Sequence, residues 1–325
     1  MSDNNINEEK VEQLEKEELV QNELPEESSK KPYQDVIEEA RKDLYKSFML
    51  SRRISNIVMF AVVIAIVGIM FLIISNNNIM KIIGYSLAGA LVIGMIVYYL
   101  INRKKFPNKT KEYVQIVSEA LNQRAFSKQG YSEIKCDPEE RMKLDDIIGD
   151  GVYEEANGVN SRNVVHGVFN GHHFLYAEAA LTRPSTRKQQ VPPLFVGHYI
   201  STPNQLKFDS RFIFVSKNPK EPLDLPNAVN DLVLLEDKED WMVYGPEGAN
   251  YHQIIDNKII SKIRNIQLGG HLLNVNVVFW EGHTAAYLSY DDTIMSVPFD
   301  KPFDYQGFEK AFDDLYACLE AITEE

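Results

Sequence analysis

The chain has 325 residues, with 34 Lys and Arg against 47 Asp and Glu, which gives a formal net charge of −13. This excess of acids argues against a protein that binds nucleic acid, because phosphate binding needs concentrated cations. Hydrophobic residues make up 44% of the chain, enough for a packed core, so a wholly disordered protein is excluded. Cys136 and Cys318 are the only cysteines, which excludes a disulfide framework and a four-cysteine zinc site.

Residues 1–31 are predicted to form an acidic, disordered tail. They hold ten acids and four bases and no aromatic residue, so they offer little apolar surface to offset the entropy lost on ordering. Val11, Leu14 and Leu19 could line one face of a helix that forms on a partner. An inert tail is the alternative.

Residues 32–53 are predicted to form a juxtamembrane amphipathic helix. Pro32 precedes a run in which apolar residues recur at helical spacing. These residues are Val36, Ile37, Ala40, Leu44 and Phe48.

Two long apolar runs give the strongest signal in the chain. Residues 57–74 and 82–101 are 18 and 20 residues long and contain no charged side chain. At about 1.5 Å per residue they are long enough to cross a hydrocarbon core of about 30 Å. The short polar loop 75–81 makes them antiparallel neighbours, so residues 54–102 are predicted to form a transmembrane helical hairpin in a lipid bilayer.

Basic residues are concentrated before the first run and after the second, and are nearly absent from the loop between them. Arg41, Lys42, Lys46, Arg52 and Arg53 precede the first run, and Arg103, Lys104, Lys105, Lys109 and Lys111 follow the second. The connecting loop holds only Lys81. The positive-inside rule therefore predicts that both termini are cytoplasmic.

Two further features belong to this region. Ser86, Ala90 and Gly94 lie four residues apart, a stripe that serves either packing between the two spans or association with a second copy of the chain. Residues 103–130 are predicted to form a basic stalk helix that begins at a Thr110 cap and packs against the helix at 32–53. Its apolar face would comprise Tyr113, Ile116, Val117, Ala120 and Leu121.

Residues 131–325 are predicted to form a cytoplasmic α+β domain with a mainly antiparallel sheet. Asn170 and Gly171 mark a hairpin within residues 163–181, and a second hairpin is predicted over 285–297 with its turn at Asp291 and Asp292. Further strands are predicted at 194–200, 212–216, 240–244 and 272–280, and helices at 251–266 and 305–322. Strands precede the last helix, as in an α+β fold that ends in a helix.

Several stretches of this region resemble bacterial membrane proteins of the DUF3137 family. These stretches are FVGHYIST at 195–202, LEDKEDWMVYGPEGANYHQIIDNKIISKI at 235–263, VNVVFWEGHTAAYL at 275–288, and the segments 164–167 and 212–215. The resemblance covers about residue 35 to the C-terminus and rests on apolar, Gly and Tyr positions. It implies a two-span protein of the bacterial plasma membrane and no particular reaction. The acidic tail and the basic insertion 182–188 depart from the family pattern.

No catalytic, cofactor-binding or metal-binding residue is assigned from the sequence. The histidines are His166, His172, His173, His198, His252, His271 and His283. With a two-residue turn, the hairpin register places His166 and His173 on one face as diagonal neighbours, close enough to share a metal in principle, but no acid is placed with them. Ordinary exposed or capped histidines are the simpler reading.

Other chemical signals are weak. Asp145, Asp146 and Asp150 lack the spacing of a calcium loop, and a solvated turn is expected there. There is no phosphate-binding loop, nucleophile elbow or zinc-protease motif. Cys318 falls on the apolar face of the last helix and is expected in the core, and no base is indicated for Cys136.

The sequence therefore predicts a membrane-anchored protein whose cytoplasmic domain is a binding or interaction module at the inner leaflet. Its partner would be a protein, a small ligand or a second copy of the chain, with no nucleic acid and no cofactor. The alternative is an enzyme that acts on a membrane-proximal substrate with a dispersed active site. An exposed apolar or sheet-edge surface would favour binding, and a cleft of histidines or carboxylates with shifted pKa values would favour the enzyme.

Overall fold

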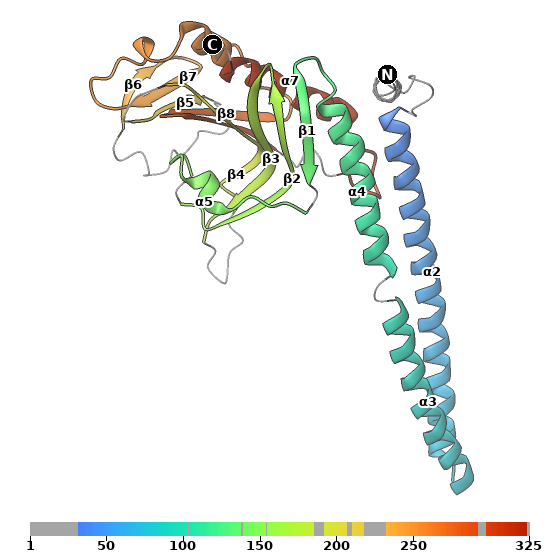
Figure 1. The fold of residues 1–325 in the computed structure, drawn as a ribbon. Helices are drawn as coiled ribbons and strands as arrows, with labels where there is room; N and C mark the ends of the chain where they lie inside the picture. The colour runs from blue at the N-terminus through green and yellow to red at the C-terminus, as the bar shows by residue number, and fades with distance from the viewer. Residues whose placement is uncertain are drawn as a thin grey trace, which may run out of the picture.

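The structure is a computed structural model that describes residues 32–102, 105–137, 139–153, 155–184, 192–206, 210–217, 232–291 and 297–323. A sheet domain lies at one end of a long helical hairpin, which projects away from it (Figure 1). The predicted α+β fold is confirmed. The acidic tail and the predicted turn at Asp291 and Asp292 lie wholly or partly outside the described residues.

The first helix, α2, runs without interruption from Tyr33 to Ile74. It unites the predicted amphipathic helix with the first apolar run, since no Gly or Pro separates the two. The chain turns at Ser75, and Asn77 caps the next helix by accepting a hydrogen bond from the backbone nitrogen of Ile79 at 2.9 Å. Helix α3 then runs from Asn78 to Asn102. Both helices are long and apolar enough to cross a membrane.

Helices α2 and α3 come into close contact at Gly84. A Cβ atom at this position would lie 2.9 Å from Ile73 Cγ1 and 3.2 Å from Leu72 Cβ, so the two helices approach each other where the side chain is absent. The predicted stripe of Ser86, Ala90 and Gly94 is exposed instead. Of the two roles considered for the stripe, packing between the two spans is therefore wrong, because another face of α3 contacts α2.

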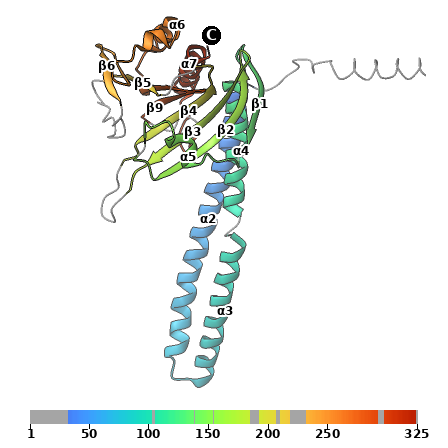
Figure 2. The same cartoon turned by 60° about the vertical axis from the view of Figure 1, so that its left-hand side comes forward.

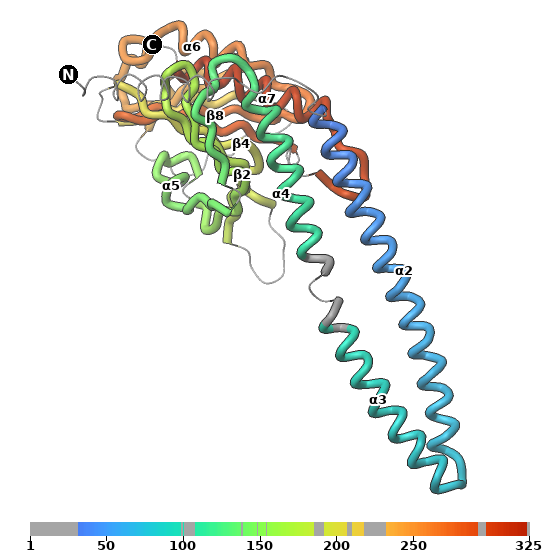
Figure 3. The backbone as a smooth tube through the Cα atoms, turned by 45° about the vertical axis from the view of Figure 1, so that its right-hand side comes forward, coloured from blue at the N-terminus to red at the C-terminus, as the bar shows by residue number. Residues whose placement is uncertain are grey.

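Helix α4 runs from Lys105 to Ala125 and continues the line of α3 alongside α2 (Figure 3). Thr110 lies inside this helix, so the predicted cap at Thr110 is wrong. The predicted stalk is confirmed: α2 packs against α4, and Lys109 Nζ donates to Ser47 Oγ at 2.7 Å. The predicted face of α4 is buried at Tyr113, Val117, Ala120 and Leu121.

The domain is built on one nine-stranded antiparallel sheet with strand order β1-β2-β3-β4-β9-β8-β5-β7-β6. The strands are β1 (Tyr131–Asp137), β2 (Gly158–Phe169), β3 (His172–Thr182), β4 (Phe195–Pro203), β5 (Phe212–Ser216), β6 (Val233–Asp237), β7 (Trp241–Gly245), β8 (Leu272–Trp280) and β9 (His283–Tyr290). The edge strands β1 and β6 are mostly exposed, whereas β9 in the middle is almost wholly buried. β1 and β6 lack a regular alternation of apolar and polar residues, which explains why the sequence did not predict them as strands.

The predicted hairpin at Asn170 and Gly171 is confirmed. Phe169 pairs with His172 and Val168 with His173, and both turn residues have positive φ angles (49° and 92°), as a two-residue turn of this type requires. The predicted hairpin over 285–297 is wrong. Strand β9 pairs with β8 on one side and β4 on the other, so both of its edges are already occupied.

Helices cover one face of the sheet. Helix α7 (Tyr305–Ile322), α6 (Asn257–Arg264) and the short 3-10 helix η2 (Tyr251–Gln253) lie over it together with α4 and the first part of α2 (Figure 2). The other face packs against the short helix α5 (Leu144–Ile148) and the loops around it. The predicted helix at 305–322 is confirmed, and the one predicted at 251–266 is split into η2 and α6.

The larger core does not stop at Tyr131, where the sequence suggests that the domain begins. Ile37 and Leu44 of α2, and Tyr113 and Leu121 of α4, are buried in the same cluster as the sheet and α7. The stalk is therefore part of the domain's core rather than a separate tether.

Candidate functional site

Five chain segments meet at the end of the sheet that lies away from the α2–α3 hairpin (Figure 1). They are the β2–β3 turn, the end of β4 with the loop after it, the end of β8 with the start of β9, the start of α6 with Ile254 before it, and the end of α7. Between them lies a cavity of about 540 Å³. Small-molecule sites in proteins commonly measure about 300–1,000 Å³, so the cavity has the size of a ligand site.

The buried lining of the cavity, here called its floor, is mostly apolar, and the more exposed lining, here called its rim, is mostly polar. Its apolar lining comprises Leu206, Ile254, Ile259, Phe279 and Ile322. Its polar lining comprises His172, His173, Asn204, Gln205, Asp256, Thr284 and Thr323. Gly171 and Pro203 complete the described lining. Such a surface can remove an apolar group from water while holding a polar group at the mouth.

Asn204 holds one wall of the cavity in place. Its Nδ2 donates to the carbonyl oxygen of Trp280 at 3.1 Å and to Thr284 Oγ1 at 2.8 Å. Its Oδ1 accepts from the backbone nitrogen of Leu206 at 3.0 Å, an Asx turn that sets the direction of the chain after β4. The wall is therefore fixed before any ligand binds.

Asp256 is an exposed residue of the cavity lining. It is the N-cap of α6, and its Oδ1 accepts from the backbone nitrogen of Lys258 at 2.7 Å. Because the capping bond fixes the side chain, the carboxylate is held at the rim. No described residue donates to its second oxygen, Oδ2.

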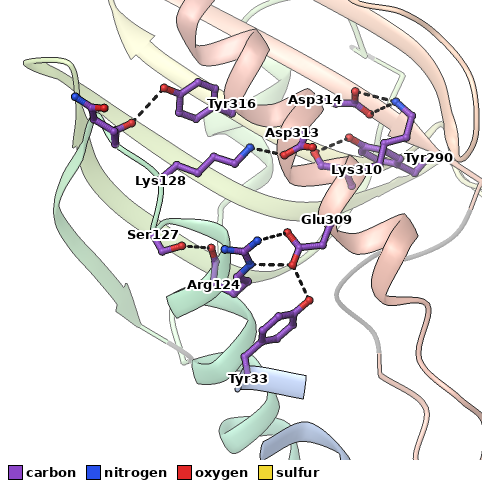
Figure 4. Close-up of polar contacts among 12 residues, drawn as sticks. Tyr33, Arg124, Ser127, Lys128, Tyr290, Glu309, Lys310, Asp313, Asp314 and Tyr316 are labelled. Carbon is purple, nitrogen blue, oxygen red and sulfur yellow. Dashed lines mark hydrogen bonds and ion pairs between the residues drawn. The ribbon is translucent and has the colours of Figure 1, made fainter. Parts of the chain in front are cut away.

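A group of polar contacts joins the stalk to α7 beside the domain (Figure 4). Arg124 of α4 binds both carboxylate oxygens of Glu309, at 2.8 and 2.9 Å, and Tyr33 at the start of α2 donates to the same carboxylate at 2.7 Å. Burial alone would raise the pKa of Glu309, but Arg124 and Tyr33 stabilise the carboxylate and hold its pKa below the usual value. Lys128 forms an ion pair with Asp313 one turn further along α7.

Two more contacts in the same view involve α7, one of them with the sheet and one within the helix (Figure 4). Tyr290 donates to the carbonyl oxygen of Ala311 at 3.2 Å. Lys310 lies 3.1 Å from the Asp314 carboxylate, yet burial raises the pKa of Asp314 above its usual value. None of the residues in these contacts was singled out from the sequence. Because the contacts join α2, α4 and α7 to one another, their role is structural.

The histidines are dispersed over the domain. His166 pairs with Glu140 at 3.0 Å, and His271 lies between Asp291 (2.7 Å) and Asp304 (3.0 Å). His172 and His173 line the cavity. The register confirms that His166 and His173 share a face, but within the described residues no three His, Cys, Asp or Glu side chains are placed to share a metal ion.

His198 lies in the core under α7. Its ring contacts Tyr176, Tyr290 and Phe312 with centroid distances of 5.2, 4.9 and 5.1 Å. Neither ring nitrogen has a hydrogen-bond partner among the described residues, and burial lowers its pKa to about 3. The imidazole is therefore uncharged near pH 7.

The remaining residues considered from the sequence have structural positions. Asp150 is buried, accepts from the backbone nitrogen of Val152 at 3.0 Å and contacts the Tyr287 hydroxyl, so the solvated turn expected there is wrong for this residue. Cys318 is buried, as predicted, and burial raises the pKa of its thiol to about 12. Cys136 is exposed as a residue, but partial burial of its thiol against Asn122 and the nearby carboxylates raise its pKa, so neither thiol is a ready nucleophile.

Sequence reasoning did not single out the cavity. His172 and His173 were counted among the histidines, but Asn204, Asp256 and Thr284 were not considered. The Asn204 turn and the Asp256 cap have recognisable local signals. The neighbouring sequence of Asn204 and Asp256 does not indicate that the two residues line the same cavity.

The fold and the cavity define an α+β protein with a long apolar helical hairpin and a pre-formed pocket at the opposite end. No protein-family model matches the chain, and no curated protein is significantly similar to it. Among solved structures, the chain is similar to the mycobacterial trehalose monomycolate transport factor A, TtfA, with 13% identity and a TM-score of 0.36. The match covers 63% of this chain and 95% of that one, and at this level it says nothing about function.

Proposed function

We propose that the chain is a two-span protein of the bacterial plasma membrane whose cytoplasmic domain is a binding module for a small ligand. The apolar side chains of α2 and α3 support the anchor, because many of them, such as Phe60 and Phe71, are exposed in the absence of lipid. The basic residues that flank the hairpin support an orientation with both termini in the cytoplasm. Membership of the DUF3137 family is part of this proposal.

The observation that carries the binding role is the cavity of about 540 Å³ with its apolar floor and polar rim. Phe279, Ile259 and Ile322 on the floor belong to the buried core, so the floor is rigid, and the Asn204 hydrogen bonds hold the wall. A pre-formed apolar site needs little reorganisation to bind, which favours affinity. The domain would thus present the ligand site to the cytoplasm, away from the membrane end of the stalk.

The enzyme alternative has less support within the described residues. The strongest pKa shift of a histidine belongs to His198, which is enclosed by aromatic side chains and does not line the cavity. The described carboxylates with altered pKa values are Glu38, Glu236, Asp304, Glu309 and Asp314, and none of them lines the cavity. These groups do not converge on one cleft, as a catalytic site would require.

The orientation is tested with a reporter enzyme that is active only outside the cytoplasm. Fused at Asn77, in the loop between α2 and α3, it should be active, and fused after Glu325 it should be silent. The reverse pattern would refute the proposed topology.

The binding role is tested with the full chain in phosphatidylcholine nanodiscs and 4-fluorobenzyl alcohol as the probe, followed by ¹⁹F NMR. We expect saturable binding that is lost in Ile254→Trp, whose indole would occupy the cavity. Val114→Trp is the matched control, since Val114 is exposed on α4 away from the cavity. Equal binding to both variants would refute the assignment of the cavity as the ligand site, and melting curves would show that both remain folded.

A further inference from the structure

The rim of the cavity carries one fixed negative charge. Asp256 is an exposed lining residue, and its Oδ1 accepts a hydrogen bond from the backbone nitrogen of Lys258 at 2.7 Å. Its Oδ2 has no hydrogen bond or ion pair with any described residue. The Lys258 side chain is exposed and makes no ion pair with Asp256. One carboxylate oxygen is therefore left to bind a donor from a ligand.

The described lining holds no lysine or arginine that would neutralise this charge. The other rim groups near the turn are His172 and His173. A neutral imidazole can accept a hydrogen bond through one ring nitrogen, so both can receive a donor as well. The rim thus offers acceptors from two chain segments, the β2–β3 turn and the start of α6.

The net charge of the whole domain has the same sign as the charge of Asp256. Residues 131–325 hold 17 Lys and Arg against 31 Asp and Glu, which leaves 17 − 31 = −14. A field of this sign concentrates small cations and repels small anions. An acidic ligand would have to approach against both the domain's field and Asp256.

We propose that the cavity binds a small apolar molecule with one ammonium group, and this rests on the proposed binding function. The ammonium group would lie at Asp256 Oδ2 and the apolar body on Phe279, Ile259 and Ile322. An ammonium group has three donors and no acceptor, which matches a rim of a carboxylate and imidazoles. The apolar body gains from the floor because that surface leaves water on binding.

The test compares three fluorophenyl probes of similar size whose polar groups are cationic, neutral and anionic: 4-fluorobenzylamine, 4-fluorobenzyl alcohol and 4-fluorobenzoate. Each is titrated by ¹⁹F NMR against the full chain in phosphatidylcholine nanodiscs at pH 8, with lipid-only nanodiscs subtracted. We expect the amine to bind at least threefold more tightly than the alcohol, and the carboxylate to bind most weakly. The preference for the amine should shrink as the salt concentration rises.

The variant Asp256→Asn isolates the charge. Asparagine is as good an N-cap as aspartate, so α6 should keep its start and the cavity its shape. We expect the variant to bind the alcohol as before and to lose the preference for the amine. Asp145→Asn is the matched control, because Asp145 is exposed on α5 on the other face of the sheet and should leave the preference unchanged.

The outcomes separate this inference from the proposed function. Equal affinities for the amine and the alcohol, or an unchanged preference in Asp256→Asn, would overturn the inference and leave the binding site in place. Tightest binding of the carboxylate would do the same. Failure of all three probes to bind would overturn both the inference and the proposed function.

Discussion

At the scale of single residues, His198 is a polar group in an apolar place. It lies on β4, near the middle of the sheet, between Tyr176, Tyr290 and Phe312. A buried polar group without a hydrogen-bond partner costs about 1–3 kcal/mol. This destabilisation is a large fraction of the free energy of unfolding expected for a domain, which is about 5–15 kcal/mol.

His198 should make the domain sensitive to acid. Its pKa is about 3 in the folded chain against 6.5 ordinarily, so below pH 6.5 the unfolded chain binds a proton that the folded chain does not. Stability therefore falls as the pH drops below about 6.5. We expect His198→Leu to reduce this loss between pH 7 and pH 5 and to raise the melting temperature at pH 7, measured by tryptophan fluorescence. An identical slope in the variant would contradict the assignment.

His271 should act in the opposite direction. Hydrogen bonds to Asp291 and Asp304 raise its pKa above 6.5, so the folded chain holds the proton more tightly than the unfolded chain. Its contribution is complete below pH 6.5 and is lost as the pH rises through the raised pKa. We expect His271→Gln to lower the melting temperature more at pH 6 than at pH 9. A loss that does not depend on pH would show that the ion pairs contribute nothing.

At the scale of elements, Gly84 sets the distance between α2 and α3. Because a Cβ atom would lie 2.9 Å from Ile73 Cγ1, Gly84→Leu should force the helices apart, whereas Gly94→Leu meets no atom within 4 Å and should not. The measurement is the distance between spin labels at the exposed positions Phe60 and Ile96 in nanodiscs. A wider distance in both variants, or in neither, would contradict the observed packing.

The joint between α4 and α7 is a second test at this scale. The Arg124 and Glu309 side chains are 43% and 33% exposed, so solvent screens their attraction, and we expect a coupling of about 0.5–1 kcal/mol. A double-mutant cycle with Arg124→Gln and Glu309→Gln measures it from the free energies of unfolding. Tyr33→Phe should remove part of the same coupling, because Tyr33 donates to the same carboxylate. Additive single effects would show that the pair is not coupled.

At the scale of the whole molecule, the stalk and the domain share one core. Ile37 and Leu44 of α2 and Leu121 of α4 are buried with Phe308 and Phe312 of α7. A fragment that begins at Tyr131 would expose this surface, and we expect it to aggregate or to melt at a much lower temperature than the full chain. A chain in which residues 54–104 are replaced by a short Gly/Ser linker should stay folded, because α2 and α4 remain side by side. Equal melting temperatures for the two shortened chains would refute the shared core.

Much of this architecture was predictable from local patterns. Two uncharged runs indicated the long apolar helices, Asn170 and Gly171 indicated the β2–β3 turn, and the spacing of Phe308, Phe312 and Leu315 indicated α7. Each of these signals lies within about 20 neighbouring residues and follows from helix or strand periodicity. Polar edge strands such as β1 and β6 have no such period, so they were missed.

The sequence by itself determined which segments are apolar, where the charges lie and how the chain turns locally, because hydrophobic periodicity and turn chemistry act between near neighbours. Only the tertiary structure decided that Gly84 rather than Gly94 packs the hairpin, that the stalk is part of the core, and that Asp256 meets His172 at one cavity. These contacts join residues far apart in the chain. They depend on strand order and on the packing of helices over the sheet, which no local pattern specifies.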